Sequence, residues 1–367
     1  QDYAEKLTRA EIGGFPNGEF CFTDHIDGLG ENPETLVINA KVIISDNSIT
    51  VDFEGTSKQV PAGVNPSFPF TKAATYAALR SVMESDIPNC HGFTVPIKVK
   101  APLGSLVNPK FPAPCGARGI TGYRIIDCLF GALSKAVPDR VTADTAGGST
   151  LPTISGYENG KPFVFCETFM GTWGGTSKHD GQSGVPHMGA NQSNVSIEMI
   201  ESKYPIRINK YGFIKNTGGP GKYRGGLGLI REYEILSDSA SLNVRSDKRK
   251  FPPHGLFGGK NGSKSYNIIN PNSQRRILPV LMTEVEKLKK GDIYSHEMSG
   301  GGGYGEPIER VESLVLKDII EDKVDIKIAE SEYGVAVIKD NFGNLTVDKK
   351  RTRLLRNKLS SNSSSII

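Results

Sequence analysis

Two glycine-rich segments constrain what this chain can fold into more than any other feature. Residues 216–228 hold six glycines in thirteen positions, and residues 300–303 are four glycines in a row. Glycine loses more conformational freedom on folding than any other residue, so such a density needs a structural reason. The usual reasons are a positive φ angle or the close approach of another group to the backbone. Both segments are therefore predicted either to hold a ligand or to pack closely.

Residues 216–228 do not match a phosphate-binding loop. Gly221-Lys222 is followed by Tyr223, whereas a P-loop requires Ser or Thr there, and the next element is predicted as a strand rather than a helix. A helix N-terminus that could hold an anion is therefore missing. Lys222 and Arg224 could still form a nest for an anion and are the candidate ligand-binding residues. The alternative, which we favour, is a set of turns that pack two sheets closely.

The composition indicates a β-rich α+β protein with more than one lobe. A chain of 367 residues is too long for one small core, and its 42 glycines and 22 prolines favour many turns and short strands. We expect a mixed, multi-lobed architecture with a few packed helices. Its predicted parts are an α+β lobe over residues 1–160, a β-rich lobe with the glycine loops over 161–348, and a basic and polar tail over 349–367.

Hydrophobic periodicity locates individual elements within these parts. Helices are predicted at residues 71–85, 119–137, 191–203 and 308–321. Two hairpins are predicted, at 36–44 with 48–53 and at 332–339 with 343–347. Further strands are predicted at 93–100, 162–169, 207–214, 227–235 and 239–245.

Charge and hydropathy argue against several partners. The net charge is only +4 and is spread along the chain, so nucleic acid is not a favoured partner. No apolar run approaches the roughly 20 residues that span a bilayer, so no membrane association is expected. The five cysteines are odd in number, scattered and without a CxxC pair, which is typical of reduced thiols in a cytoplasmic protein.

His179 and Asp180 are the residues most suited to acid–base chemistry. With His187, eight residues further on in a loop rich in Gly and Ser, they could supply a metal site or an acid–base pair. Solvated loop histidines are the alternative, because the spacing matches no zinc pattern. The carboxylate-rich turn at residues 24–31 lacks the spacing of a calcium loop, so a plain turn is favoured there.

Cys115 is the best-placed candidate for a reactive thiol. It lies just before the helix predicted at 119–137, and a helix N-terminus lowers the pKa of a thiol. The sequence has no GxSxG elbow and no recognisable Ser-His-Asp arrangement. The residues taken alone therefore predict no reaction.

Many short motifs in a characteristic order nevertheless resemble a known family. The motifs are Val51–Ser57, Pro88–Gly92, Pro102–Ser105 with Asn108-Pro109, Pro112-Ala113, Gly174-Gly175, Asp180-Gly181, Glu198 with Glu201, residues 218–228, Pro253–Gly259, Ser299–Pro307 and Tyr333–Val335. Each motif is weak by itself. Their number and order over nearly the whole chain resemble the hydantoinase B/oxoprolinase family.

The resemblance implies an ATP-dependent system of two parts. An A-type subunit similar to actin-like ATPases binds ATP and Mg²⁺ and phosphorylates an amide or carbonyl oxygen of the substrate. The B-type part, which this chain resembles, completes hydrolysis of a cyclic amide such as hydantoin, 5-oxoproline or a lactam. Water on a divalent transition metal (Zn, Mn or Fe) is the expected nucleophile. The alternatives are a subunit of an ATP-dependent ketone carboxylase of the acetone or acetophenone type, and a non-catalytic assembly module.

Two departures from the family pattern limit what this chain is expected to carry. The family's N-terminal GGTHxxD segment, which supplies metal ligands, has no counterpart here, and the chain opens at Gln1 rather than Met. We therefore expect the C-terminal portion of a B-type subunit, with the N-terminal portion as a partner and metal ligands upstream of Gln1 or on another chain. Asn216-Thr217 replaces the family's Asp-Ser, which removes a possible carboxylate beside the glycine loop.

Overall fold

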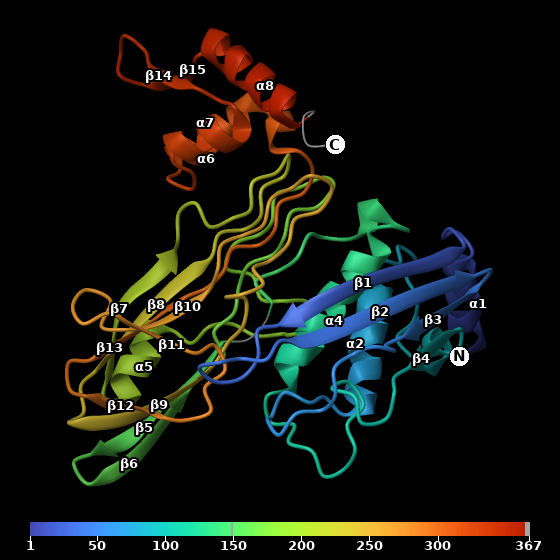
Figure 1. The fold of residues 1–367 in the computed structure, drawn as a ribbon, viewed down its shortest axis with the longest axis horizontal. Helices are drawn as coiled ribbons and strands as arrows, with labels where there is room; N and C mark the ends of the chain where they lie inside the picture. Colours follow the sequence, from blue (N-terminus) through green and yellow to red (C-terminus); the bar gives the residue numbers. More distant parts are fainter. Residues whose placement is uncertain (148–149, 364–367) are drawn as a thin grey trace.

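The computed structural model describes residues 1–147 and 150–363, which form two large lobes and a small C-terminal one (Figure 1). Within this described part there are eight α-helices and fifteen strands. The predicted α+β class, β-rich with a few packed helices, is therefore confirmed. The end of the predicted polar tail, residues 364–367, lies outside the described residues.

The first lobe is a four-stranded sheet with helices packed against it, drawn in blue to green in Figure 1. Its elements are α1 (Asp2–Ile12), β1 (Gly18–Ile26), β2 (Leu36–Ser45), β3 (Ser48–Asp52), α2 (Phe68–Ser81), α3 (His91–Thr94), β4 (Ile97–Lys100), α4 (Arg118–Leu133) and the 3-10 turn Pro138–Arg140. The sheet order is β1-β2-β3-β4, antiparallel except for the parallel pair β3 and β4. Helix α4 packs against β1 and β2, and α2 packs against α4.

Alternating burial explains the hairpin of β2 and β3. Every second residue of β2 from Leu36 to Ile44 faces the core, and the residues between them are more exposed. A strand with this period has one buried face, which fixes its register. The turn places Asp46 at a φ angle of 52°, a conformation that Asp tolerates better than most residues. The hairpin predicted at 36–44 and 48–53 is confirmed.

The second lobe is a sandwich of two antiparallel sheets. Its elements are β5 (Leu151–Glu158), β6 (Lys161–Cys166), α5 (Ile197–Lys203), β7 (Ile206–Phe213), β8 (Leu229–Ile235), β9 (Ser239–Arg245), β10 (Tyr266–Ile269), β11 (Arg276–Leu278), β12 (Glu286–Lys289) and β13 (Ile293–Glu297). The sheet orders are β11-β10-β13-β8-β7 and β12-β9-β5-β6. Ile154 and Leu242 of the four-stranded sheet share one core with Tyr233 and Tyr294 of the five-stranded sheet.

Between the second lobe and the C-terminal lobe, chain segments outside the regular strands run side by side (Figure 1). We call this region the glycine bundle; it consists of residues 143–146, 172–176, 180–184, 217–228, 253–263 and 299–305. The segments are joined by backbone hydrogen bonds, such as Gly219 N to Gly301 O at 2.8 Å, Gly301 N to Gly226 O at 3.0 Å and Gly226 N to Trp173 O at 2.9 Å. Each segment therefore has backbone neighbours on several sides.

Close approach of neighbouring backbones explains the glycine content. A Cβ atom on Gly225 would lie 1.9 Å from the carbonyl oxygen of Gly301, and one on Gly302 would lie 1.9 Å from that of His254. Neither Gly225 nor Gly302 has a positive φ angle. Of the two reasons that the sequence leaves open for these positions, close packing is the one that applies.

The C-terminal lobe is a small helical unit with one hairpin, at the top of Figure 1. Its elements are the 3-10 turn Pro307–Glu309, α6 (Glu312–Ile320), α7 (Ile326–Tyr333), β14 (Val337–Lys339), β15 (Leu345–Val347) and α8 (Lys349–Ser363). Helix α8 covers most of the predicted tail, and its Thr352 is buried and accepts a hydrogen bond from Ala336 N at 3.0 Å. The division of the chain at residues 160 and 348 stays a prediction.

Several predicted elements are shorter in the structure than the sequence pattern indicated. The strand predicted from residue 93 begins at Ile97, because the preceding residues form α3. The strand predicted from residue 332 begins at Val337, because α7 continues to Tyr333 and is ended by Gly334 at a φ angle of 62°. The helix predicted at 191–203 is formed only over α5.

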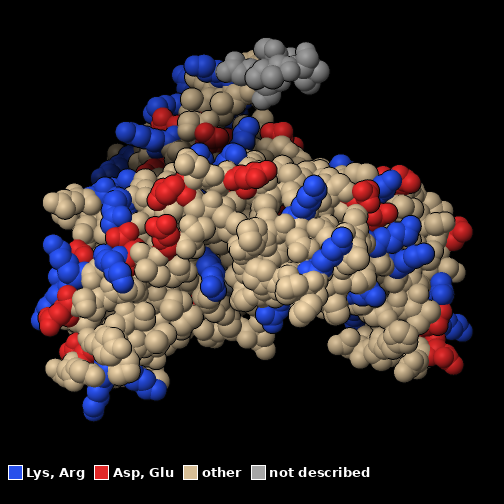
Figure 2. All heavy atoms as spheres, turned by 60° about the horizontal axis from the view of Figure 1, so that its bottom comes forward, with Lys and Arg blue, Asp and Glu red and all other residues tan. Residues whose placement is uncertain are grey.

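The face of the molecule in Figure 2 carries mixed charge. Acidic and basic side chains lie next to one another on both large lobes in the face that Figure 2 shows. A nucleic-acid-binding protein typically has a basic stripe instead. Among the described residues, no helix has the length and apolar character needed to cross a membrane.

Candidate functional site

Helix α4 carries a buried charge at the junction of the two large lobes. Thirteen of its sixteen residues are buried, because the helix packs both on β1 and β2 of the sheet and on α2. Most of these residues are apolar or small, but Arg124 and Asp127 are fully buried as well. A buried charge requires a partner, so their surroundings define the candidate site.

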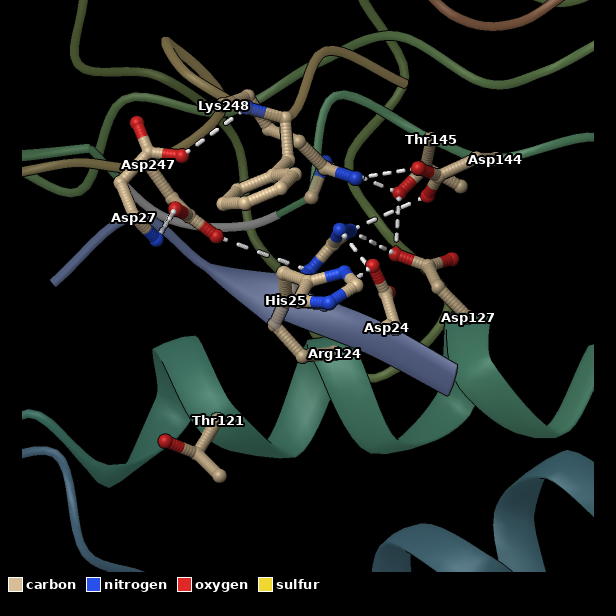
Figure 3. A network of polar contacts seen from close by, with 12 residues as sticks. Asp24, His25, Asp27, Thr121, Arg124, Asp127, Asp144, Thr145, Asp247 and Lys248 are labelled. Carbon is tan, nitrogen blue, oxygen red and sulfur yellow. Dashed lines mark hydrogen bonds and ion pairs between the residues drawn. The ribbon is translucent and has the colours of Figure 1, made fainter. Parts of the chain in front are cut away.

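Arg124 lies at the centre of four carboxylates, as Figure 3 shows. Its Nη2 is 2.7 Å from Asp127 Oδ2 and 3.1 Å from Asp144 Oδ1. Its Nη1 is 3.2 Å from Asp24 Oδ2, an ion pair whose angles fall outside those of a hydrogen bond. Its Nε is 3.7 Å from Asp247 Oδ2. We call Arg124 and these four aspartates the Arg124 network.

The network joins parts of the chain that are far apart in sequence. Asp24 lies on β1 and Asp127 on α4, whereas Asp144 and Asp247 lie on segments that lead into and out of the second lobe. Asp144 also belongs to the glycine bundle, where its carbonyl oxygen accepts a hydrogen bond from Gly302 N at 2.8 Å. Asp144 is therefore positioned both by the packing of the two large lobes and by the hydrogen bonds of the glycine bundle.

Further donors surround Asp144 and Asp127. Asp144 pairs with Lys248 Nζ and with His254 Nδ1, the latter at 3.1 Å. Asp127 accepts a hydrogen bond from Thr145 Oγ1 at 3.0 Å and lies 3.4 Å from His187 Nε2. Several donors on one buried carboxylate favour its ionised form, but at Asp144 burial outweighs Arg124 and His254 and raises the pKa to about 6.

The surroundings shift the pKa values of two of the aspartates in opposite directions. Burial raises the pKa of Asp247 well above its usual range, the neighbouring charge of Asp27 adds to the rise, and the more distant Arg124 guanidinium does not offset it. Burial also favours a high pKa for Asp127, but His187 and Arg124 outweigh it and lower the pKa. The surroundings therefore favour the neutral form of Asp247 and the ionised form of Asp127.

His254 has a raised pKa. Burial alone lowers the pKa of an imidazole, but the charge of Asp144 and its hydrogen bond to His254 outweigh burial. The residue also contributes its backbone, because its N–H donates to Asp144 Oδ2 at 3.1 Å. Asp144 thus favours the protonated form of His254, which lies against the same carboxylate as Lys248.

The Arg124 network does not fit a divalent metal ion. Its carboxylates are directed at the guanidinium of Arg124, which occupies the position that a cation would need. Among the described residues no group of three or more His, Cys, Asp and Glu side chains has an arrangement that could hold a metal. The metal that the family resemblance implies therefore has no donor set in this part of the chain.

The residues predicted from the sequence lie outside the Arg124 network. Two of them, Asp180 and Arg224, lie where the glycine bundle meets the C-terminal lobe. Asp180 accepts two hydrogen bonds from Arg310, at 2.6 and 2.7 Å. Arg224 is buried and pairs with Asp318 at 3.3 Å, and Arg310 pairs with Asp318 at 2.8 Å. These four side chains form one chain of ion pairs that ties the C-terminal lobe to the bundle.

The other two predicted residues lie at the surface. Lys222 pairs with Glu309 at 3.3 Å, and both side chains are about half exposed. His179 is exposed, and its side chain has no polar contact with any described residue. The structure thus brings Asp180 and Arg224 into one network but leaves His179 and Lys222 outside it. Their catalytic and anion-binding roles stay predictions.

The carboxylate-rich turn after β1 serves the lobe junction. Asp27 accepts hydrogen bonds from the backbone N–H groups of Arg249, Lys250 and Phe251, at 2.7 to 3.2 Å. His25 stacks on the ring of Phe251 with ring centroids 4.4 Å apart. Asp27 is therefore satisfied by backbone donors, as expected for a structural turn.

The Arg124 network was not identified from the sequence, although a signal is present. Arg124 and Asp127 are three residues apart within an otherwise apolar helical stretch, where α4 has no polar face on which to expose them. Side chains at this spacing are neighbours on a helix, so the pattern is typical of a buried ion pair. Its partners on β1 and in the loops at 144 and 247 could not be found without the fold.

A cavity of about 320 Å³ opens between the two large lobes at the start of α4. We call it the interlobe cavity. It is lined by Phe70, Gly116, Ala117, Arg118, Gly119, Ile120, Tyr123, Leu151, Thr168, Gly189, Gln192 and Arg245. Its size is that of a site for a small metabolite.

Comparison with known proteins places this architecture in a family. The family model for hydantoinase B/oxoprolinase matches residues 1–307, which is most of the chain. The chain belongs to this family. The resemblance inferred from the ordered motifs is therefore confirmed, and the C-terminal lobe lies almost entirely beyond the matched region.

Relatives with curated names match over nearly the whole chain. An uncharacterized protein of Methanocaldococcus jannaschii is 36% identical over 97% of this chain and 61% of its own length. A putative B-type D-/L-hydantoinase subunit of Pseudomonas sp. is 34% identical over the same shares. The chain thus spans about three fifths of the length of these relatives.

Two solved structures share the fold. The ATP-dependent caprolactamase from Pseudomonas jessenii superposes with a TM-score of 0.85 at 25% identity, over 97% of this chain and 62% of that one. Nucleotide-free acetone carboxylase superposes with a TM-score of 0.89 at 18% identity, over 99% and 55%. The second likeness is one of fold alone.

Proposed function

We propose that this chain is part of the B-type subunit of an ATP-dependent enzyme that opens a cyclic amide. The relation to the putative B-type hydantoinase subunit, 34% identical over 97% of the chain, carries the proposal. The beta subunit of the caprolactamase from Pseudomonas jessenii, 27% identical over the same share, supports it. A 5-oxoprolinase of Arabidopsis thaliana, 29% identical over 74% of the chain, supports it as well. All three names describe the opening of a cyclic amide.

The chemistry explains why such a reaction needs ATP. A cyclic amide is a poor electrophile because its nitrogen donates electrons to the carbonyl group. We propose that an A-type ATPase partner, which binds ATP and Mg²⁺, transfers the γ-phosphoryl group to the amide oxygen and releases ADP. Water then adds to the activated carbon, the ring C–N bond breaks, and the nitrogen takes a proton. A second water attacks the resulting acyl phosphate at carbon and releases inorganic phosphate.

This chain's own residues support that reaction through position rather than through metal binding. The Arg124 network holds the first lobe, the second lobe and the glycine bundle at fixed positions around the interlobe cavity. Catalytic groups need positions defined to a fraction of an ångström, and buried ion pairs among packed elements supply such rigidity.

The five cysteines are unpaired, which supports a reducing, cytoplasmic location.

The direct test is turnover by the complete B-type protein together with its A-type partner. We expect ATP hydrolysis to depend on a cyclic amide and to match ring opening one for one, with neither protein active alone. Ring opening by the isolated chain would contradict the partner requirement. ATP consumption that depends on bicarbonate and a ketone, rather than on a cyclic amide, would instead identify a carboxylase.

A further inference from the structure

The interlobe cavity contains an arginine whose side chain pairs with no described residue. Arg245 is the last residue of β9, where alternation turns Val244 into the core of the sandwich and Arg245 onto the opposite face. There its side chain is half-buried and lines the cavity. It makes no hydrogen bond or ion pair with the side chain of any residue that the structure describes. A half-buried guanidinium normally pairs with an anion, so Arg245 is available to a ligand.

A second arginine lines the same cavity from the first lobe. Arg118, at the start of α4, lies over the ring of Phe70 with its guanidinium carbon 5.3 Å from the ring centroid. This stacking holds the guanidinium plane in place while its outer edge remains free for other contacts. A hydrogen bond of 3.4 Å to the carbonyl oxygen of Cys115 uses one of its donors. The two lobes thus each supply one cation to the cavity.

The remaining lining favours a small anion that also has an apolar or amide part. Among the described residues that line the cavity, none is acidic, so the two positive charges are not offset there. Ile120 and Leu151 provide apolar surface, and Thr168 and Gln192 provide polar groups. Arginine pairs with carboxylate and phosphate groups through two parallel hydrogen bonds, which suits either kind of anion.

We propose that the interlobe cavity binds the anionic group of the substrate, with Arg245 as the main contact and Arg118 as the second. This inference rests on the proposed function and specifies its substrate class: a cyclic amide that carries an anionic group. That group is either a carboxylate on the ring or the phosphoryl group of the activated amide. Because each lobe supplies one arginine, the anion also bridges the lobes.

Binding measurements on the complete B-type protein test the proposal. Isothermal titration calorimetry would compare 5-oxoproline, its neutral analogue 2-pyrrolidinone and inorganic phosphate. We expect Arg245→Gln to weaken binding of 5-oxoproline or phosphate roughly ten- to a hundredfold, as for loss of a charged hydrogen bond, and to leave 2-pyrrolidinone unaffected. Arg245→Lys is expected to restore part of the affinity, since it keeps the charge but not the two parallel donors.

A matched control separates this effect from a change in surface charge. Arg275 is exposed, lies outside the cavity lining, and its side chain makes no hydrogen bond or ion pair with a described residue. Arg275→Gln should therefore leave all three affinities unchanged. Thermal unfolding should show that Arg245→Gln is folded, as expected for a side chain with no hydrogen bond or ion pair to a described residue.

The outcomes distinguish the binding site from the proposed reaction. Loss of affinity for 5-oxoproline alone identifies a ring carboxylate as the anion, and loss for phosphate identifies the phosphoryl group. Equal affinities in the Arg245→Gln and wild-type proteins, or no binding of either anion to wild type, would overturn the proposed site. In that case coupled turnover by the complete complex would still support the proposed function. Arg245-dependent anion binding without any cyclic-amide turnover would keep the site and remove the function.

Discussion

Replacing Arg124 with methionine is expected to lower the free energy of unfolding by about 3–5 kcal/mol, because the change leaves buried carboxylates without their cation. Asp24, Asp127 and Asp144 lose a guanidinium that lies 2.7 to 3.2 Å from their oxygens. Methionine retains a long apolar side chain and a high helix propensity, so the loss of charge dominates the effect. Urea unfolding followed by circular dichroism measures the change.

Two other substitutions show whether the effect belongs to the Arg124 network. Arg207→Met makes the same change at a surface pair, where the Arg207 side chain is 59% exposed and lies 3.6 Å from Glu234. We expect its cost to stay within about 1 kcal/mol. Asp247→Asn should also cost far less than Arg124→Met, because burial and the charge of Asp27 raise the pKa of Asp247 and so already favour its neutral form. An Arg124→Met protein as stable as wild type would contradict the role of Arg124 at the lobe junction.

Replacing Gly302 with alanine is expected to prevent the glycine bundle from forming. The new Cβ atom would lie 1.9 Å from the carbonyl oxygen of His254, far inside contact distance. Overpacking of a side chain into a core costs typically about 1–3 kcal/mol, and a clash with backbone that is itself hydrogen-bonded should exceed that range. We expect little folded protein, measured as the soluble yield and the urea midpoint of the purified fraction.

A glycine in an open position provides the matched control. Gly212 on β7 has no atom within 4 Å of the position of a Cβ and is not at a positive φ angle. Gly212→Ala should therefore be neutral, or stabilising by up to about 1 kcal/mol through the unfolded chain. If Gly302→Ala folds as stably as Gly212→Ala, close backbone packing is not the reason for the glycines.

The effect of Gly302→Ala should reach the candidate site as well. Gly302 N donates to the carbonyl oxygen of Asp144, and Asp144 N donates to the carbonyl oxygen of His254. Asp144 and His254 also pair through their side chains, beside Arg124. Any purified Gly302→Ala protein should therefore also have a loosened lobe junction.

Local pattern was enough to predict the elements whose burial repeats regularly. The alternation of Leu36 to Ile44 located β2, which has one buried face, and apolar spacing located α4, which is buried on nearly all sides. Boundaries were less well predicted where a helix occupies the first residues of a predicted strand, as at α3 and α7. The helical start of α3 is set by its packing on α1, a contact that sequence periodicity does not contain.

The candidate site was hard to predict because it depends on segments brought together only by the fold. Arg124 meets Asp24 and Asp247, which are 100 and 123 positions away in the sequence. The sequence favoured Asp180 and Arg224 because they lie beside conspicuous glycines, and in the structure both are engaged in ion pairs. Arg245 carried no sequence signal, since a charged residue at a strand end is common.

The fate of the amide oxygen tests the proposed phosphorylation of the substrate most directly. The complete B-type protein and its A-type partner would be supplied with ATP and a cyclic amide labelled with ¹⁸O at the carbonyl group. Phosphorylation of that oxygen, followed by attack of water at the acyl carbon, predicts one ¹⁸O atom in each molecule of inorganic phosphate released. Ring opening with unlabelled phosphate, and with all of the label retained in the product carboxylate, would contradict it.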